Sequence, residues 1–273
     1  MLKKLCLLNC LLGCILFSSS CTAQNDSSSQ IKEAFFAWTE GYIALAQGES
    51  WTFCLSYYFP EFLYDHAFEE AISVELQSDS DISVVMVEQF HRSDSAMPAQ
   101  QNGIAFKGLY LTVSATQQGQ MICNALLLHQ PDGSIVRRSF GEITFDVGPA
   151  EPDTPAFDTW SGPAIASSPE SFAYAWGQKN VNAQMLSIQY GNNQFITDPS
   201  QLYDAMAVPQ GLPVSATFLL DSYQAPLVYI KAKITVQTPM GTHIEYAKGC
   251  YCGSDFDAND IALSLAQNGA TNS

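Results

Sequence analysis

Apolar and polar positions follow the same order in two successive stretches of the chain. Each stretch opens with an aromatic segment, residues 34–38 in the first and residues 172–176 in the second, which we interpret as helical. Each then continues as runs rich in β-branched and aromatic residues, separated by Gly, Pro and Asp, which is typical of strands joined by tight turns. Helices followed by an antiparallel meander indicate the α+β class.

Turn sequences mark where the strands should reverse. Residues 131–133 (Pro-Asp-Gly) and 238–241 (Thr-Pro-Met-Gly) combine the fixed φ of proline with the positive φ that glycine tolerates, so each predicts a hairpin. Residues 117–119 (Gln-Gln-Gly) predict a third hairpin. The runs separated by these turns are 103–115, 120–129 and 135–145 in the first stretch and 227–237 and 242–252 in the second.

Residues 148–170 divide the two stretches. This segment concentrates proline and glycine, which do not fit a helix interior or a central strand. We therefore expect two tandem domains: a first α+β domain over residues 31–147, a linker over 148–170 and a second α+β domain over 171–273.

The second stretch resembles the nuclear transport factor 2-like (SnoaL-like) family. In that family an N-terminal helix carrying a tryptophan packs into the mouth of a curved sheet; Trp176 and residues 198–199 (Asp-Pro) match positions in its pattern. In the first stretch Trp38 matches, whereas residues 59–60 (Phe-Pro) stand where the Asp-Pro would be. The resemblance implies two cone-shaped domains, each with N-terminal helices packed on a curved antiparallel sheet around a pocket, and it does not imply what fills the pocket.

The first 21 residues predict export. A short basic start is followed by an apolar run over 5–17, small residues over 18–20 and then Cys21. This order is typical of a secretory signal, and the run is too short to cross about 30 Å of hydrocarbon. A cysteine directly after the small residues resembles the bacterial lipoprotein signal, which implies a signal peptide over 1–20 and lipidation of Cys21.

The lipidation site has an alternative. Residues 11–14, which end in Cys14, match the lipoprotein consensus more closely, but cleavage there would leave a signal of only 13 residues. We favour Cys21, because a polar tether over 21–30 then begins at the lipid; a plain signal peptide stays open. Thr22 is not the aspartate that resembles an inner-membrane retention signal, so we expect a lipid anchor in the outer membrane of a bacterial envelope, facing either the periplasm or the surface.

The net charge of the chain limits the classes of partner that it can bind. The whole chain carries a formal charge of −16, and removal of residues 1–20 with their two lysines leaves −18. Such a surface repels phosphate backbones, which excludes nucleic acid. Hydrophobic residues make up 47% and aromatic residues 12% of the chain, so it can bury a large core.

Four cysteines remain after Cys21, in a compartment where disulfides persist: Cys54, Cys123, Cys250 and Cys252. We expect Cys250–Cys252 to be the least favoured pairing, because alternate residues of a strand have backbone geometry unsuited to a bridge. A Cys54–Cys123 bond and four buried free thiols both stay open.

Candidate metal ligands have simpler interpretations. His66, Glu69 and Glu70 would share one helix face, which we interpret as solvated. Residues 255–260 resemble a calcium loop but lack its glycine and its bidentate glutamate; we interpret Asp257 as the N-cap of a short helix ending near residues 268–269. We therefore expect no metal and no cofactor.

The leading functional hypothesis is non-enzymatic: a cell-envelope lipoprotein that binds a small apolar ligand or a protein partner, or serves as a scaffold. We assign no catalytic residue. The aromatic residues expected to line a ligand site are Trp38, Tyr64, Trp176 and Tyr203. The alternative is an exported enzyme that acts on a hydrophobic small molecule through a pocket acid–base pair, for which the residue types are supplied by Tyr64, Asp65, Tyr203 and Asp204.

Overall fold

The computed structural model describes residues 33–62, 65–78, 82–99, 103–160, 165–166, 171–179, 182–191, 213–219, 223–253 and 257–270. The expected signal peptide and tether, with Cys21, lie outside these residues, as do Tyr64 and Tyr203. Residues Glu33–Ser273 form one compact unit. Within the described part of the chain, no helix is long and apolar enough to cross a bilayer.

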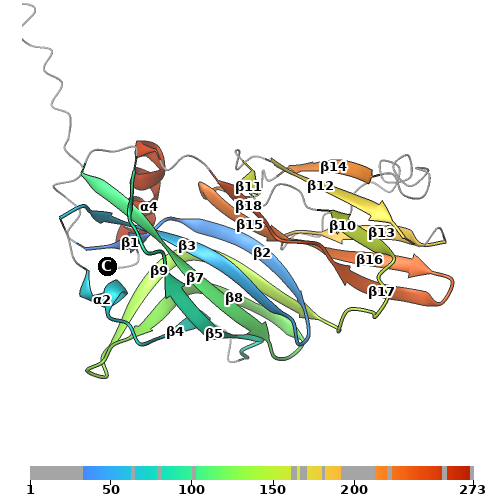
Figure 1. Cartoon of the computed structure of the whole chain (residues 1–273), viewed down its shortest axis with the longest axis horizontal. Coiled ribbons are helices and arrows are strands. Elements are labelled where there is room, and N and C mark those ends of the chain that lie inside the picture. Colours follow the sequence, from blue (N-terminus) through green and yellow to red (C-terminus); the bar gives the residue numbers. More distant parts are fainter. Residues whose placement is uncertain are drawn as a thin grey trace, which may run out of the picture. The chain divides into compact units, whose positions relative to one another are not determined.

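Strands dominate the described residues and form four sheets (Figure 1). The first sheet consists of β1 (Phe35–Phe36), β3 (Ser50–Pro60), β7 (Ile104–Ala115) and β5 (Val85–Arg92), with β6 (Met97–Pro98) paired to β7. The second consists, in order, of β11 (Ile165–Ala166), β18 (Cys250–Gly253), β15 (Leu227–Lys231), β2 (Thr39–Ala46), β9 (Ile135–Gly148), β8 (Gly119–His129) and β4 (Ser73–Ser78).

Two three-stranded sheets complete the strands. One has the order β10 (Phe157–Trp160), β12 (Ser171–Gln178) and β14 (Pro213–Leu219); the other has the order β13 (Gln184–Gln189), β16 (Lys233–Thr238) and β17 (Gly241–Tyr246). The helices in the described residues are α2 (His66–Glu69) and α4 (Ala258–Ala270).

The predicted α+β class is wrong, and so is the resemblance to tandem nuclear transport factor 2-like cones with N-terminal helices. Both segments that we interpreted as helices are strands, β1 and β12. In residues 172–176 aromatic residues alternate with alanine, which is the period of a strand. In β1, Phe35 and Phe36 are consecutive and both buried, so this segment has no polar face by which an amphipathic helix could be recognised.

Two of the three expected hairpins are confirmed. β8 pairs antiparallel with β9 across residues 131–133, and β16 pairs antiparallel with β17 across residues 238–241. β7 and β8 are not partners: β7 lies between β3 and β5, whereas β8 lies between β9 and β4. The turn at 117–119 therefore carries the chain from one sheet to another. The run 227–237 likewise divides into β15 and β16, which belong to different sheets.

The first hydrophobic core lies between two sheets. Phe53, Leu55 and Leu111 reach it from the first sheet, and Leu126 and Phe145 reach it from the seven-stranded sheet. Each of these side chains is at most 3% exposed, and full burial of one large apolar side chain contributes about 1.5–3 kcal/mol. This pair of facing sheets is a β-sandwich.

A second hydrophobic core lies on the other side of β2. Ile43 and Leu45 of β2 belong to the first core, whereas Tyr42, Ala44 and Ala46 belong to the second. The second core also contains buried residues of β13, β15 and β16. β2 is therefore buried on both faces, and it pairs in parallel with β9 on one side and with β15 on the other.

Strands from both expected domains thus share one sheet. β2 and β9 precede the segment 148–170, and β15 and β18 follow it. Two short strands, β10 and β11, lie within that segment. The division of the chain at 148–170 stays a prediction.

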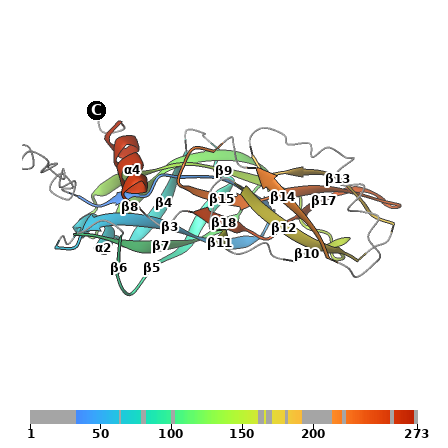
Figure 2. The same ribbon diagram turned by 90° about the horizontal axis from the view of Figure 1, so that it is seen from above.

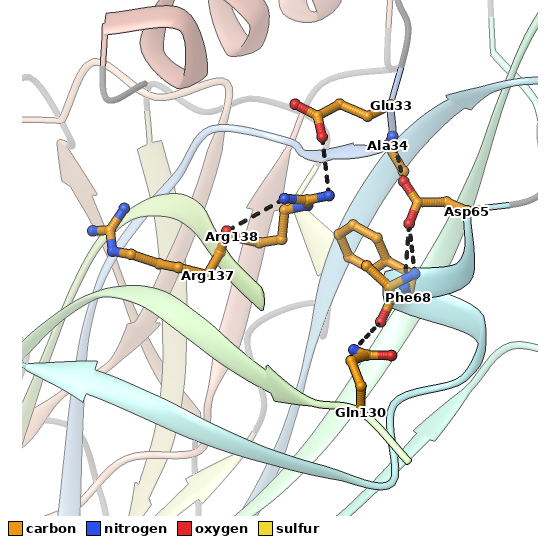
Figure 3. Close-up of polar contacts among 8 residues, drawn as sticks. Glu33, Ala34, Asp65, Phe68, Gln130, Arg137 and Arg138 are labelled. Atoms are coloured by element: carbon orange, nitrogen blue, oxygen red, sulfur yellow. Dashed lines mark hydrogen bonds and ion pairs between the residues drawn. The ribbon is translucent and has the colours of Figure 1, made fainter. Parts of the chain in front are cut away.

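The first described residues are attached to the sandwich by polar contacts (Figure 3). The Ala34 N–H donates to Asp65 Oδ2 at 2.8 Å, and Asp65 also caps α2 by accepting from the N–H groups of Ala67 and Phe68. The Arg138 guanidinium pairs with Glu33 at 3.0 Å and lies over the Phe68 ring. Asp65 is therefore a structural carboxylate.

The predicted N-cap of the last helix is confirmed. Asp257 Oδ1 accepts from the N–H groups of Asn259 at 2.8 Å and Asp260 at 3.0 Å, which fixes the start of α4. α4 contacts β1 and β9, and Figure 2 shows it at the same end of the described strands as α2.

A lysine is buried at the end of β15. The Lys231 side chain is 5% exposed, and its Nζ lies 3.1 Å from a carboxylate oxygen of Glu49 and 5.4 Å from the centre of the Tyr246 ring. Burial lowers the pKa of Lys231 below its ordinary 10.5, and Glu49 opposes that shift. The Glu49 carboxylate therefore stabilises the buried Lys231 ammonium, which would be costly in free energy without a counter-charge.

We expect Glu49→Gln to lower the free energy of unfolding by about 2 kcal/mol at pH 7, because it leaves a buried ammonium without its counter-charge. Lys231→Met should cost less, since Glu49 is 29% exposed and can be solvated. Urea unfolding of the two variants measures the difference.

The pH dependence supplies the control. Without Glu49, Lys231 loses its proton at a lower pH in the folded state than in the unfolded state. The loss in free energy of unfolding caused by Glu49→Gln should therefore become smaller as the pH rises toward 10.5. An equal loss in both variants at every pH would contradict this account.

Candidate functional site

A β-bulge in β9 creates the site. Cys123 of β8 pairs with Ile143 of β9, and Ala125 pairs with Ser139, so three residues of β9 stand opposite the single residue Asn124. Such an irregularity interrupts the ladder and bends the strand. β9 also gains its second partner here, because pairing with β2 begins at Gly141.

Gly141 makes this change of partner sterically feasible. Its φ is +119°, and a Cβ at this position would lie 2.0 Å from the Thr39 carbonyl oxygen and 2.8 Å from Trp38 Cδ1. A side chain would therefore push the start of β2 away from β9. The glycine brings the Trp38 ring against the bulge.

The bulge, the start of β2 and α4 enclose a cleft of about 280 Å³. This volume is just below the range for ligand pockets, which begins at about 300 Å³. The lining combines apolar and polar surface and comes from Trp38, Glu40, Asn124, Arg137, Ser139, Phe140, Gly141, Glu142, Gln267 and Asn268.

Arg137 is held by its neighbours on the sheet. Its Nε donates to Gln77 Oε1 at 2.6 Å, and its two terminal nitrogens donate to Ser139 Oγ at 2.7 Å and Asn124 Oδ1 at 3.2 Å. These bonds use three of the five N–H donors of a guanidinium. Figure 3 shows Arg138 turned toward Glu33 while Arg137 extends away from it, as expected for neighbours on a strand.

α4 is attached to the opposite wall through backbone contacts. The Trp38 N–H donates to Ser264 Oγ at 2.9 Å, and Asn268 Nδ2 donates to the Phe36 carbonyl at 3.1 Å. Ser264 is fully buried and donates its own proton to the Asp260 carbonyl at 2.7 Å. The backbone around Trp38 and the last turns of α4 are therefore fixed relative to one another.

Two carboxylates, one guanidinium and several amides set the electrostatics of the cleft. Glu40 Oε2 already accepts from the Gln224 N–H at 2.8 Å, so this carboxylate also holds the chain before β15. Glu142 is exposed beside the bulge. The cleft thus offers both donors and acceptors, with charges of both signs and aromatic surface from Trp38.

Of the residues expected to bind a ligand, the structure places Trp38 on the wall of this cleft. Trp176 belongs to β12, in a different sheet, and Tyr64 and Tyr203 lie outside the described residues, so the four are not brought together by any contact that the structure describes. The binding role of each stays a prediction.

Sequence reasoning missed Asn124, Arg137, Glu142 and the two amides of α4. None of them belongs to a motif, because the site is assembled from two strands and a distant helix. One signal was available: Gly141 interrupts an otherwise strand-like run, which indicates a bulge or a close backbone approach. That signal points to the centre of the site.

Among the described residues, no group of three or more His, Cys, Asp or Glu side chains could hold a metal ion. On α2, His66 Nδ1 pairs with Glu70 at 2.8 Å, and Glu69 pairs with Lys107 at 2.8 Å. These side chains are engaged in ion pairs at the surface. Cys54, Cys123, Cys250 and Cys252 are not joined in disulfides among the described residues, and the Sγ atoms of the last two are 3.7 Å apart.

No protein-family model matches the chain, and no curated protein matches it. Solved structures with similar stretches include domains 4–9 of the surface layer protein SbsC, with a TM-score of 0.23 and 11% identity over 82% of this chain and 31% of that one.

Two further matches contain glycan ligands. They are a Bacteroides ovatus mixed-linkage glucan utilization locus protein, SGBP-B, bound to a heptasaccharide (TM-score 0.22, 11% identity, 77% of this chain and 42% of that one), and a sialic acid-binding region of a Streptococcus sanguinis adhesin (TM-score 0.23, 8% identity, 82% and 78%). TM-scores at this level assign neither a fold nor a ligand to this chain.

We expect Gly141→Ala to destabilise the protein by about 3 kcal/mol, because it combines an unfavourable φ with overlap against the Thr39 carbonyl. Gly133→Ala is the matched control: its φ is +84°, but nothing lies within 4 Å of the added Cβ, so the loss should be about 1 kcal/mol. Thermal and urea unfolding of both variants test the difference; equal losses would mean that close approach at Gly141 does not constrain the bulge.

Proposed function

We propose that this chain is an exported, lipid-anchored binding protein without catalytic activity, and that the cleft at the β9 bulge takes a small, uncharged, polyhydroxylated ligand such as the terminal sugar of a glycan. The observation that carries the proposal is the lining of the cleft, in which Trp38 lies among amide, carboxylate and guanidinium groups.

A sugar ring fits this lining by its chemistry. The ring has a face of C–H groups, which can pack on an indole, and a rim of hydroxyls, each of which both donates and accepts hydrogen bonds. Asn124, Gln267 and Asn268 carry amide groups that do the same, Arg137 donates and Glu142 accepts. The volume of about 280 Å³ suits one or two sugar rings better than a large ligand.

Net charge favours a neutral ligand. The chain carries −16, and two of the lining residues are acidic, so an anion would be repelled on approach. A cation would meet Arg137. A small apolar ligand, our first expectation, would leave the polar groups of this cleft desolvated and unpaired, which costs about 1–3 kcal/mol for each group.

The geometry does not favour the enzymatic alternative. Asp65, one of its acid–base candidates, is used to cap α2 and to hold Ala34. Glu40, the carboxylate beside Trp38 in the cleft, accepts from the backbone of the chain before β15. Both carboxylates stabilise local structure, and neither is paired with a tyrosine hydroxyl in the hydrogen bonds that the structure describes.

The test is binding of a panel of neutral mono- and oligosaccharides to the full chain, measured by calorimetry or saturation-transfer NMR. We expect Trp38→Ala to weaken binding of the best saccharide at least tenfold, about 1.4 kcal/mol, through loss of the aromatic wall. Gln267→Ala, an exposed change in the same cleft, should weaken it several-fold.

The matched control is Trp51→Ala. Trp51 is a half-buried tryptophan on β3 that packs on Phe53 and Tyr229, away from the cleft. This variant should lose stability and keep its affinity. The proposed ligand would be rejected if no saccharide bound, or if Trp38→Ala and Trp51→Ala lost equal affinity for the best saccharide. A protein partner would then be the remaining candidate ligand.

The anchor is tested separately. We expect the wild-type chain to incorporate labelled fatty acid in a bacterial host with a lipoprotein pathway, Cys21→Ser to abolish incorporation, and Cys14→Ser to leave it intact. The measurement is fatty-acid labelling followed by mass spectrometry of the mature N-terminus. Labelling that is lost with Cys14→Ser instead would move the anchor to Cys14, and no labelling of the wild type would reject lipidation.

A further inference from the structure

Two cysteines lie in contact within the second core. Cys250 and Cys252 are on β18 with one residue between them, so both side chains point to the same face of the sheet. Their Sγ atoms are 3.7 Å apart, and the residues are 2% and 0% exposed. Both belong to the hydrophobic core that also buries Val228 and Ile230 of the neighbouring β15.

The backbone span does not prevent a bridge. Two residues along a strand separate Cα atoms by about 6.6 Å, and disulfides join Cα atoms that are up to about 6.8 Å apart. Sequence reasoning placed this pairing last because strand geometry is unfavourable to it. The structure brings the two sulfurs into contact despite that geometry; a disulfide requires them to close from 3.7 Å to about 2.05 Å.

The other two thiols do not compete for this pair. Cys54 alternates with Phe53 and Leu55, which face the first core, so it points to the opposite face of β3; a Cβ on Gly108 would lie 2.7 Å from its Sγ. Cys123 is buried in the first core. Burial raises the pKa of Cys54 to about 11 and that of Cys123 to about 12.

The contact also prepares one sulfur for reaction. A hydrogen bond between the two thiols lowers the pKa of Cys250 and raises that of Cys252. The thiolate is the nucleophile in thiol–disulfide exchange. Whichever of the two sulfurs reacts first with an oxidant, the other lies 3.7 Å away and can complete the exchange.

We propose that Cys250 and Cys252 form a disulfide within β18 when the chain meets a disulfide oxidant, such as glutathione disulfide or the oxidised form of a thiol oxidoreductase. The thiolate of one of the two cysteines attacks one sulfur of the oxidant, which forms a mixed disulfide and releases the first thiolate. The other cysteine gives up its proton and attacks the protein sulfur of that mixed disulfide, which releases the second thiolate. Two electrons and two protons leave the protein, and the oxidant is reduced to two thiols.

The test uses the C-terminal peptide of the full chain. Trypsin cleaves after Lys248, and no Lys or Arg follows, so Cys250 and Cys252 leave on one peptide that contains neither Cys54 nor Cys123. The reduced full chain is incubated with glutathione disulfide, and a second sample is exported by a bacterial host and recovered from its envelope. Both samples are denatured in the presence of excess iodoacetamide and digested with trypsin, and the peptide masses are measured by mass spectrometry.

We expect this peptide to be two hydrogens lighter than the dithiol form and unalkylated, and to take up two alkyl groups only after reduction. Cys252→Ser should abolish the change, and Cys123→Ser should leave it intact. Alkylation of both cysteines without reduction in both samples, a cross-link to Cys54 or Cys123, or stable glutathione adducts would overturn the proposal. The outcome is independent of saccharide binding.

Discussion

β2 has no solvent face, and the rest of the structure depends on how that strand is covered. Its side chains alternate between two hydrophobic cores, so layers are required on both sides and hydrogen-bonded partners at both edges. Because both partners are parallel, long connections must separate them from β2 in the sequence. Gly41 shows how tight the fit is: a Cβ there would lie 2.6 Å from the Tyr229 carbonyl oxygen.

The cleft follows from this arrangement. β9 is a longer strand than β2, and its first part pairs with β8 before β2 begins at Thr39. The sheet widens at that point, the bulge opposite Asn124 accommodates the change, and the chain that enters β2 brings Trp38 to the same place. A cavity next to the first hydrophobic core is the consequence of adding a partner strand partway along β9. α4 covers the position where that edge would otherwise be unpaired.

Individual strands and turns could be predicted from the sequence, but their partners could not. The turns at 131–133 and 238–241 could be predicted because their Pro and Gly residues favour the turn conformation locally. The N-cap Asp257 could be predicted because Asp is a preferred residue at the start of a helix. The parallel pairing of Tyr42 with Ile230 joins residues 188 positions apart, and no local pattern encodes it. The aromatic segments were misread because tryptophan and phenylalanine suit both helix and strand; the alternation in 172–176 was the better guide.

Trp38 is the one residue of the candidate site that the sequence analysis named, and it was named through a resemblance that the fold contradicts. Arg137 or Gln267 resembles any surface residue until a fold brings it to a cavity. The structure adds what the sequence could not supply, which is preorganisation. Arg137 is held by bonds to Gln77, Asn124 and Ser139 before any ligand arrives, so a ligand would not have to order it.

Such preorganisation matters most for small polar ligands, because they offer little apolar area to offset the entropy lost on binding. The two walls of the cleft differ in this respect. The β9 wall is part of a sheet that is paired along both edges from Gly141 onward, whereas the α4 wall presents exposed Gln267 from the last turns of a terminal helix. Terminal helices open more readily than central strands. Affinity should therefore come from the sheet, and adjustment to different ligands from the helix.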